Sequence, residues 1–315
     1  MAFDSLAHDG LIVVRQVRPL ISDPRMVVRA CESGELVRLR RGVYLAREQW
    51  DAKSGREQHI LRIRAVLASA RRPLVFAGVS AAALWGMPID GPWPSEVTVL
   101  DEWRGGGRSE PGVRRTAAGF MSARTVELQG IVVTDLARTV LDVARKSHFA
   151  EAVGSVDWAL SERNVNAITV SDLSEELDRL RPRTGGPHLE LTVGFGTPLS
   201  GSFGESTARA VIHQLGFEAP ELQTEFRDAE GSIYTDFWWR RVRVAGEFDG
   251  KQKYTRQEFT DGDPGEVVWR EKKREDRLRR QVNGVVRILT SDVKHPQHLE
   301  RLLLGAGVPR SGSSS

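Results

Sequence analysis

Three acidic side chains in the last third of the chain have the types and spacing to hold a divalent metal ion. Asp236 lies in the strand-like run 232–239, and Glu247 and Asp249 lie in the next run, 242–249. In a hairpin of these runs Asp236 lies opposite Glu247 or one step diagonal to it, and alternation places Asp249 on the same side as Glu247. Like charges this close repel one another unless a cation lies between them. Oxygen ligands without cysteine suit Mg²⁺ or Mn²⁺, so the pattern predicts a metal site.

Glu205 and Lys251 are candidates to complete a hydrolytic site. Glu205 begins a helix predicted over 205–215 and projects from its apolar face, where a charge needs a partner. Lys251 follows the second strand closely enough to contact a bound phosphate. A divalent ion held by two carboxylates can activate water and stabilise the charge on a phosphodiester. The chemistry indicated is phosphodiester hydrolysis.

The residues alone leave a second interpretation open. Arg241 and Arg243 alternate with Glu247 and Asp249 along the chain, which is also the pattern of a solvated strand face with ordinary ion pairs. Glu205 would then be a first-turn acid that interacts with the dipole of its own helix.

A winged helix-turn-helix is predicted for residues 1–50. Asp23 followed by Pro24 marks the start of a helix that ends at Gly34. Residues 36–46 then alternate apolar and arginine side chains around an Arg-Gly turn, which predicts a β-hairpin. Such a helix enters the major groove, and the arginines of the wing contact phosphates or the minor groove. A solvated hairpin on an arbitrary small domain is the alternative. The predicted DNA contacts are Arg25, Arg29, Arg38, Arg40 and Arg41.

The remaining chain supplies the connections between these elements. Residues 51–182 are predicted to be a mainly helical middle domain, and residues 183–204, rich in Gly, Ser, Thr and Pro, a linker. The third domain spans 205–306, and a disordered tail is expected over 307–315. A length of 315 residues fits two or three such domains.

Composition excludes several classes of protein. With 28% charged and 40% hydrophobic residues, the chain is neither collagen-like, nor a coiled coil, nor fully disordered. The single cysteine, Cys31, excludes a disulfide scaffold and a cysteine-based zinc cluster. The longest uncharged run, 73–89, is too short for a membrane helix and carries no export signal, so we expect a cytoplasmic protein without membrane contact.

Two segments resemble known families, and the first lies at the N-terminus. GELVRLRRGVYL, residues 34–45, resembles the winged helix of AbiEi-type antitoxins from type IV toxin–antitoxin systems. Residues 76–89 and 130–145 are similar to segments that follow that winged helix in many bacterial proteins, so the resemblance covers roughly the first half of the chain. It implies binding to double-stranded DNA, often with autorepression, and a cognate toxin or defence partner.

The C-terminal domain resembles the Vsr-like branch of the PD-(D/E)XK nucleases. The resemblance rests on the order GESTAR, DAEGSIYTDFWW, EFDGKQKY and EKKREDRLRRQVNGVVRI. It implies that Glu205, Asp236 and Glu247 are the acidic active-site set, with Asp249 and Lys251 accessory. The helix carrying Lys272 and Lys273 would track the DNA backbone. One departure puts cleavage in doubt, because Asp249 occupies the position where the family usually has lysine.

These inferences predict an α/β (α+β) protein with a winged helix-turn-helix, a helical middle and a restriction-endonuclease-like mixed sheet flanked by helices. The main functional prediction is metal-dependent cleavage of DNA, in phage defence or a toxin–antitoxin context. The alternative is a non-catalytic repressor or antitoxin with a degenerate nuclease fold, and a third is a protein–protein scaffold. Winged-helix proteins often act as dimers, so a homodimer is also considered, although no interface is evident in the sequence.

Overall fold

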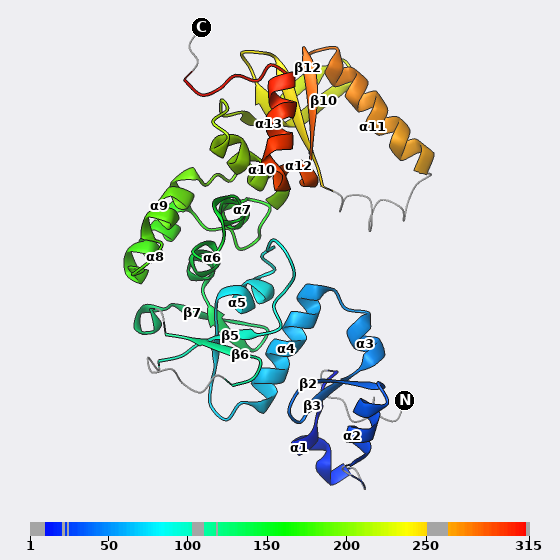
Figure 1. The fold of residues 1–315 in the computed structure, drawn as a ribbon, viewed down its shortest axis with the longest axis vertical. Helices are drawn as coiled ribbons and strands as arrows, with labels where there is room; N and C mark the ends of the chain where they lie inside the picture. Colours follow the sequence, from blue (N-terminus) through cyan, green and yellow to red (C-terminus); the bar gives the residue numbers. More distant parts are fainter. Residues whose placement is uncertain are drawn as a thin grey trace. The chain divides into compact units, whose positions relative to one another are not determined.

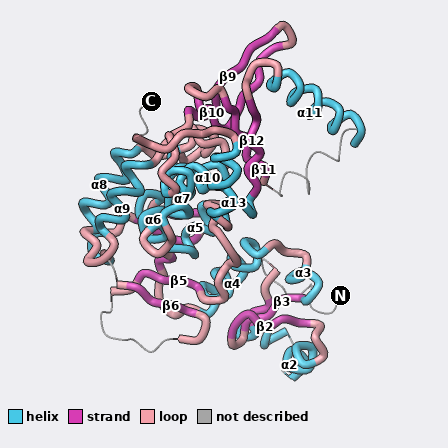
Figure 2. The backbone as a smooth tube through the Cα atoms, turned by 45° about the horizontal axis from the view of Figure 1, so that its top comes forward, coloured by secondary structure: helices cyan, strands magenta, loops and turns pink. Residues whose placement is uncertain are grey.

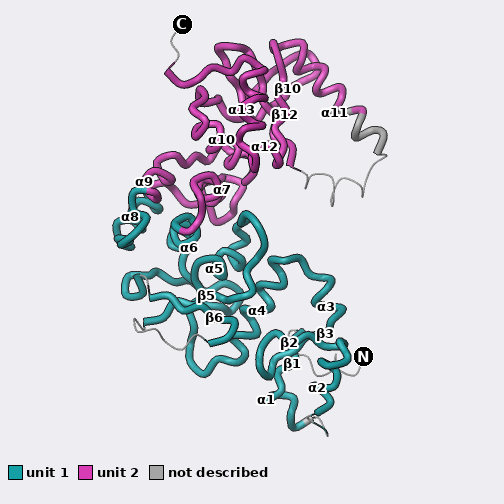
Figure 3. Tube along the Cα trace, in the orientation of Figure 1, with its two compact units in different colours: residues 1–145, 171–187 teal, residues 146–170, 188–315 magenta. Residues whose placement is uncertain are grey.

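The computed structural model describes residues 10–20, 23, 25–102, 110–117, 119–250 and 264–312. The chain divides into two compact units (Figure 3). Unit 1 comprises Met1–Arg145 and Ser171–Pro187, and unit 2 comprises Lys146–Val170 and His188–Ser315. Within the described residues, no helix has the length and apolar character needed to span a bilayer.

The predicted winged helix-turn-helix elements are present at the start of unit 1. Three antiparallel strands follow the order β1-β3-β2 (Figure 1). The side chains that form the core beneath them include Ile12, Val27, Leu36 and Tyr44. Gly42 has a φ of 78° and forms the turn between β2 and β3, a conformation that glycine adopts without strain. The elements are β1 (Ile12–Val13), α1 (Val14–Val17), η2 (Arg18–Leu20), α2 (Arg25–Glu32), β2 (Leu36–Arg40), β3 (Val43–Ala46) and α3 (Arg47–Asp51).

The middle region has the expected helices and also a five-stranded mixed sheet that the sequence analysis missed. Its strand order is β6-β5-β4-β8-β7. The strands are two to four residues long, and all four residues of β5 are buried, so the chain lacks the alternation that identifies a half-exposed strand. The elements are α4 (Gly55–Ser69), β4 (Val75–Phe76), α5 (Gly78–Trp85), β5 (Val97–Leu100), β6 (Val113–Thr116), η3 (Phe120–Ser122), β7 (Thr125–Leu128), β8 (Ile131–Thr134), α6 (Leu136–Ala144) and α8 (Val170–Leu180).

Unit 2 is built around a four-stranded sheet of order β12-β11-β10-β9, which contains the predicted strands (Figure 2). Only β11 and β12 are parallel. One face of the sheet packs Phe237 and Trp239 against α10 and α13, and the other packs Trp238 and Ala245 against Leu278 of α11. The elements are α7 (Phe149–Leu160), α9 (Gly186–Phe195), α10 (Phe203–Gln214), β9 (Glu221–Asp228), β10 (Gly231–Trp239), β11 (Val244–Asp249), α11 (Pro264–Arg279), β12 (Gly284–Leu289), α12 (Thr290–Lys294) and α13 (Pro296–Gly305).

Two segments expected to lack structure are ordered. The region 183–204, expected as a linker, contains α9, whose residues Leu189 and Val193 are buried. Residues 307–312, expected as part of a disordered tail, pack on unit 2: Val308 is buried and the guanidinium of Arg310 lies over the Phe217 ring. In both segments the small and polar residues that suggested a loop surround a few apolar side chains, and burial of those side chains holds the backbone.

Candidate functional site

Helix α2 presents the two arginines that were predicted to enter the major groove. Arg25 and Arg29 are both exposed. Asp23 accepts a hydrogen bond from the Arg25 backbone N–H at 2.9 Å and forms an ion pair with Arg29 at 2.6 Å. Asp23 therefore satisfies a backbone donor at the helix start, as the sequence pattern predicts. An exposed ion pair of this kind is weak and leaves the Arg29 guanidinium accessible to a phosphate.

The three wing arginines differ in their surroundings. Arg38 and Arg41 are exposed, on β2 and at the wing turn. The Arg40 side chain is only 14% exposed, and its guanidinium pairs with Glu110 of unit 1. Arg38 and Arg41 are thus the exposed arginines of the wing, whereas Arg40 is held against the rest of unit 1.

In unit 2, Glu205 is buried near the start of α10, as its place in the apolar pattern predicts. One oxygen, Oε2, accepts from the Gly201 backbone N–H at 2.8 Å, and Oε1 accepts from the Ser202 hydroxyl at 2.9 Å. Ser202 is itself the N-cap of the helix. At Gly204 an added Cβ would clash with the Phe248 ring, so glycine is what allows α10 to approach β11 this closely. This local geometry fixes the Glu205 carboxylate beside the sheet.

Gln223 joins two of the predicted acids, although the sequence analysis assigned it no role. Its side-chain amide donates to Glu205 Oε2 at 2.9 Å and to Asp236 Oδ1 at 3.2 Å. Gln223 has a φ of 47°, a strained left-handed conformation for a residue other than glycine. The ladder between β9 and β10 skips Gln223 and Asp236 and resumes in the same register, so these two residues lie at opposite positions on the two strands. A polar residue inside the strand-like run 222–228 was the only sequence signal.

Asp236 and Glu247 lie on neighbouring strands, and other groups of the protein contact both carboxylates. Register pairs Phe237 with Gly246, so the next step places Asp236 opposite Glu247. Asp236 Oδ2 accepts from the Phe248 backbone N–H at 2.8 Å. The Glu247 carboxylate forms an ion pair with Arg274 Nη1 of α11 at 2.7 Å. The acids come together as predicted, but the cation beside Glu247 is a guanidinium.

Asp236, Glu247 and Asp249 do not form a metal-binding cluster in this arrangement. Among the residues that the structure describes, no three His, Cys, Asp or Glu side chains are grouped to hold a metal ion. Asp249 is half-buried at the end of β11, and Lys251 lies outside the described residues. Of the arginines considered as partners of these acids, Arg241 pairs with Glu218 at 3.1 Å, and Arg243 donates to the Gln281 carbonyl at 2.5 Å.

The basic helix α11 is largely neutralised along its second half. Arg277 pairs with Asp228 at 2.5 Å and thereby lowers the pKa of that carboxyl group. Lys273, a predicted DNA contact, is exposed and pairs with Glu230 at 2.6 Å. Lys272, the other predicted contact, is also exposed. The cationic surface of α11 is therefore smaller than its sequence suggests.

A three-stranded wing packed on a helix with exposed arginines defines the N-terminal part as a winged helix-turn-helix. Residues 4–47 match a family described as "Transcriptional regulator, AbiEi antitoxin". Among solved structures, the chain is similar to the crystal structure of the RV2827C protein from Mycobacterium tuberculosis. That similarity has 16% sequence identity and a TM-score of 0.39, and covers 73% of this chain and 88% of that chain. A search of curated proteins found no match.

Proposed function

We propose that this protein is a DNA-binding transcriptional regulator that acts in a toxin–antitoxin context. The observation that carries the proposal is the match of residues 4–47 to the AbiEi antitoxin regulators, in a segment that exposes Arg25, Arg29, Arg38 and Arg41. Helix α2 would contact base edges, and the wing would contact the backbone. A cognate toxin would be the second partner.

Salt dependence of DNA binding tests this proposal. The duplex to use is the promoter region of the protein's own gene, with a scrambled duplex beside it, and fluorescence anisotropy gives the affinity at several salt concentrations. We expect affinity to fall steeply with salt, because each phosphate contact contributes a slope of about 0.9 in log–log form. The double variant Arg38→Ala/Arg41→Ala should lose about two units of that slope. Arg227→Ala, which removes a 74% exposed side chain of unit 2, is the matched control. Salt-independent binding would reject the proposal.

Oligomeric state can be measured on the same samples. A homodimer would bind two half-sites about one helical turn apart, so the footprint on the promoter duplex should be palindromic and twofold symmetric. Mass photometry of the free protein and of the complex would distinguish a dimer from a monomer.

A second candidate function, metal-dependent DNA cleavage, is favoured by one observation: Gln223 holds Glu205 and Asp236 together beside Glu247. Mg²⁺ or Mn²⁺ would be held by Asp236, Glu247 and Asp249, and this requires Arg274 to leave Glu247. The test is cleavage of plasmid, linear and mismatched DNA with each ion, using Asp236→Ala and Glu247→Ala. Cleavage that both variants abolish supports the candidate, whereas nicking that persists in both rejects the site.

A further inference from the structure

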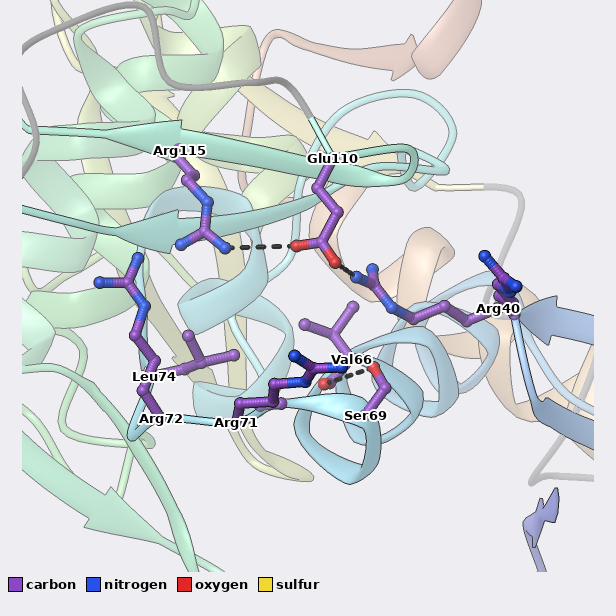
Figure 4. A pocket seen from close by; sticks show the side chains of 10 residues that line it. Arg40, Val66, Ser69, Arg71, Arg72, Leu74, Glu110 and Arg115 are labelled. Carbon is purple, nitrogen blue, oxygen red and sulfur yellow. Dashed lines mark hydrogen bonds and ion pairs between the residues drawn. The ribbon is translucent and has the colours of Figure 1, made fainter. Parts of the chain in front are cut away.

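Unit 1 contains a cavity of 660 Å³ whose rim is made of arginines from three separate parts of the chain. Arg40 and Arg41 come from the end of β2 and the wing turn, Arg71 and Arg72 follow α4, and Arg115 lies on β6 (Figure 4). Val66, Ala70 and Leu74 form an apolar part of the lining. We call this cavity the arginine pocket.

Two carboxylates hold three of these guanidiniums in place. Asp101 pairs with Arg72 at 2.5 Å and with Arg115 at 2.6 Å. Glu110 pairs with Arg115 at 3.3 Å and also with Arg40, and Figure 4 shows the two arginines reaching Glu110 from opposite sides. The chain of ion pairs fixes the positions of Arg40, Arg72 and Arg115 before any ligand arrives.

The remaining two arginines give the pocket its excess charge. Arg41 and Arg71 are exposed, and neither has a carboxylate partner among the described residues. Among the residues that the structure describes here, five guanidiniums therefore face two carboxylates, an excess of three positive charges. Guanidinium groups bind phosphate oxygens through paired N–H donors, and those already fixed in place lose little entropy on binding.

We propose that the arginine pocket is a phosphate-binding site, in which Arg41 and Arg71 bind the phosphate beside the fixed Arg115. The phosphate can come from the DNA backbone or from a free nucleotide. The backbone is the expected source, because Arg41 lies in the pocket and at the wing turn. That source rests on the proposed function, whereas phosphate binding itself does not.

The experiment compares three probes on the full chain: a promoter duplex, dAMP and inorganic phosphate. Isothermal titration calorimetry and anisotropy are applied to the wild type, Arg71→Ala and Arg71→Glu. Arg114→Ala is the matched control, because Arg114 neighbours Arg115 on β6 but pairs with Glu96 and does not line the pocket. Circular dichroism confirms that each variant folds, as expected for an exposed side chain such as that of Arg71.

We expect Arg71→Ala to weaken binding of at least one probe about tenfold, and Arg71→Glu to weaken it further. Loss of duplex affinity together with about one unit of salt slope identifies the DNA backbone as the source. If affinity falls only for dAMP and inorganic phosphate, the phosphate comes from a free small ligand. If the wild type binds no DNA, the proposed function fails, and the dAMP and phosphate titrations still decide the pocket. The site is overturned if every probe binds the Arg71 variants as well as the wild type, or if none binds at all.

Discussion

In the arginine pocket, two carboxylates are shared among three guanidiniums, and two more arginines stand beside them. In unit 2, Glu205 and Asp236 accept hydrogen bonds from donors of the protein itself, and Glu247 forms an ion pair with Arg274. The acids of unit 2 are held by neutral hydrogen-bond donors and by one guanidinium, and such internal partners contribute to the fold. In the pocket, two arginines have no carboxylate partner among the described residues, so their charge is available to an external ligand. The comparison indicates that ligand binding is the stronger expectation for unit 1.

Replacing Glu205 should have the largest effect, because its carboxylate accepts three hydrogen bonds while buried. Glu205→Ala leaves the donors of Gly201, Ser202 and Gln223 without their acceptor, at a cost of about 3 kcal/mol in the free energy of unfolding. Urea unfolding measures this loss, with Glu190→Ala on the exposed side of α9 as the control. A loss equal to that of the control would show that the carboxylate is not part of the fold.

Removing the guanidinium beside Glu247 tests whether the ion pair with Arg274 keeps metal cations away from that carboxylate. Arg274→Ala should cost about 2 kcal/mol, because the Glu247 side chain, only 12% exposed, loses its ion-pair partner. The variant should then gain stability in Mg²⁺ or Mn²⁺, measured as a rise in Tm that the wild type does not show. An equal response in both proteins would contradict this account of unit 2.

The pH dependence of stability tests the role of Asp101, one of the two shared carboxylates of unit 1. Burial alone would raise the pKa of Asp101, but the hydrogen bonds and charges of Arg115 and Arg72 outweigh burial, and the pKa lies below the ordinary 3.8. A lowered pKa stabilises the protein above the unfolded value, and this stability is lost as the pH falls through the folded value. The wild type should therefore exceed Asp101→Asn by about 1 kcal/mol at neutral pH.

The advantage over Asp101→Asn should diminish below about pH 4, where the unfolded chain begins to bind the proton. Denaturant unfolding at a series of pH values gives the difference directly. If the difference in the free energy of unfolding stays constant with pH, the charge of Asp101 does not contribute to stability.

The smallest effect on stability is expected at Arg71, whose exposed side chain holds nothing in place. Arg71→Ala should change the free energy of unfolding by less than about 0.5 kcal/mol, as is usual for surface substitutions. Thermal unfolding of Arg71→Ala and Arg274→Ala in parallel compares the two directly, because Arg274 has a carboxylate partner and Arg71 has none among the described residues. Equal destabilisation in the two variants would show that the ion pair of Arg274 contributes no more to stability than the exposed side chain of Arg71 does.

Local sequence patterns predicted the elements that carry their own periodicity. The arginine hairpin over 36–46, helix α10 and strands β9 to β11 were all legible, because alternation and capping residues act over a few positions. The short strands of the middle sheet were missed, because two to four residues are too few to show alternation, and in β5 all four residues are buried.

The candidate sites were only partly predictable, because side chains distant in sequence complete them. Glu205 and Asp236 were identified, but their connection depends on Gln223, whose strained backbone has no local sequence signature. Arg274 was assigned to a basic helix, and nothing in its neighbours indicates that it reaches Glu247. The arginine pocket likewise combines residues that are distant in sequence, such as Arg40 and Glu110, which are 70 positions apart.

The attachment of α11 gives unit 2 a sensitivity to ionic strength. Leu278 anchors the helix in apolar surroundings, while Arg274 and Arg277 fasten it to the sheet through carboxylates. Dissolved ions screen such contacts but leave apolar packing intact. Concentrated salt would thus weaken the attachment of α11 to the sheet. The amide protons of α11 would then exchange with solvent faster, while those of α10 would keep their protection.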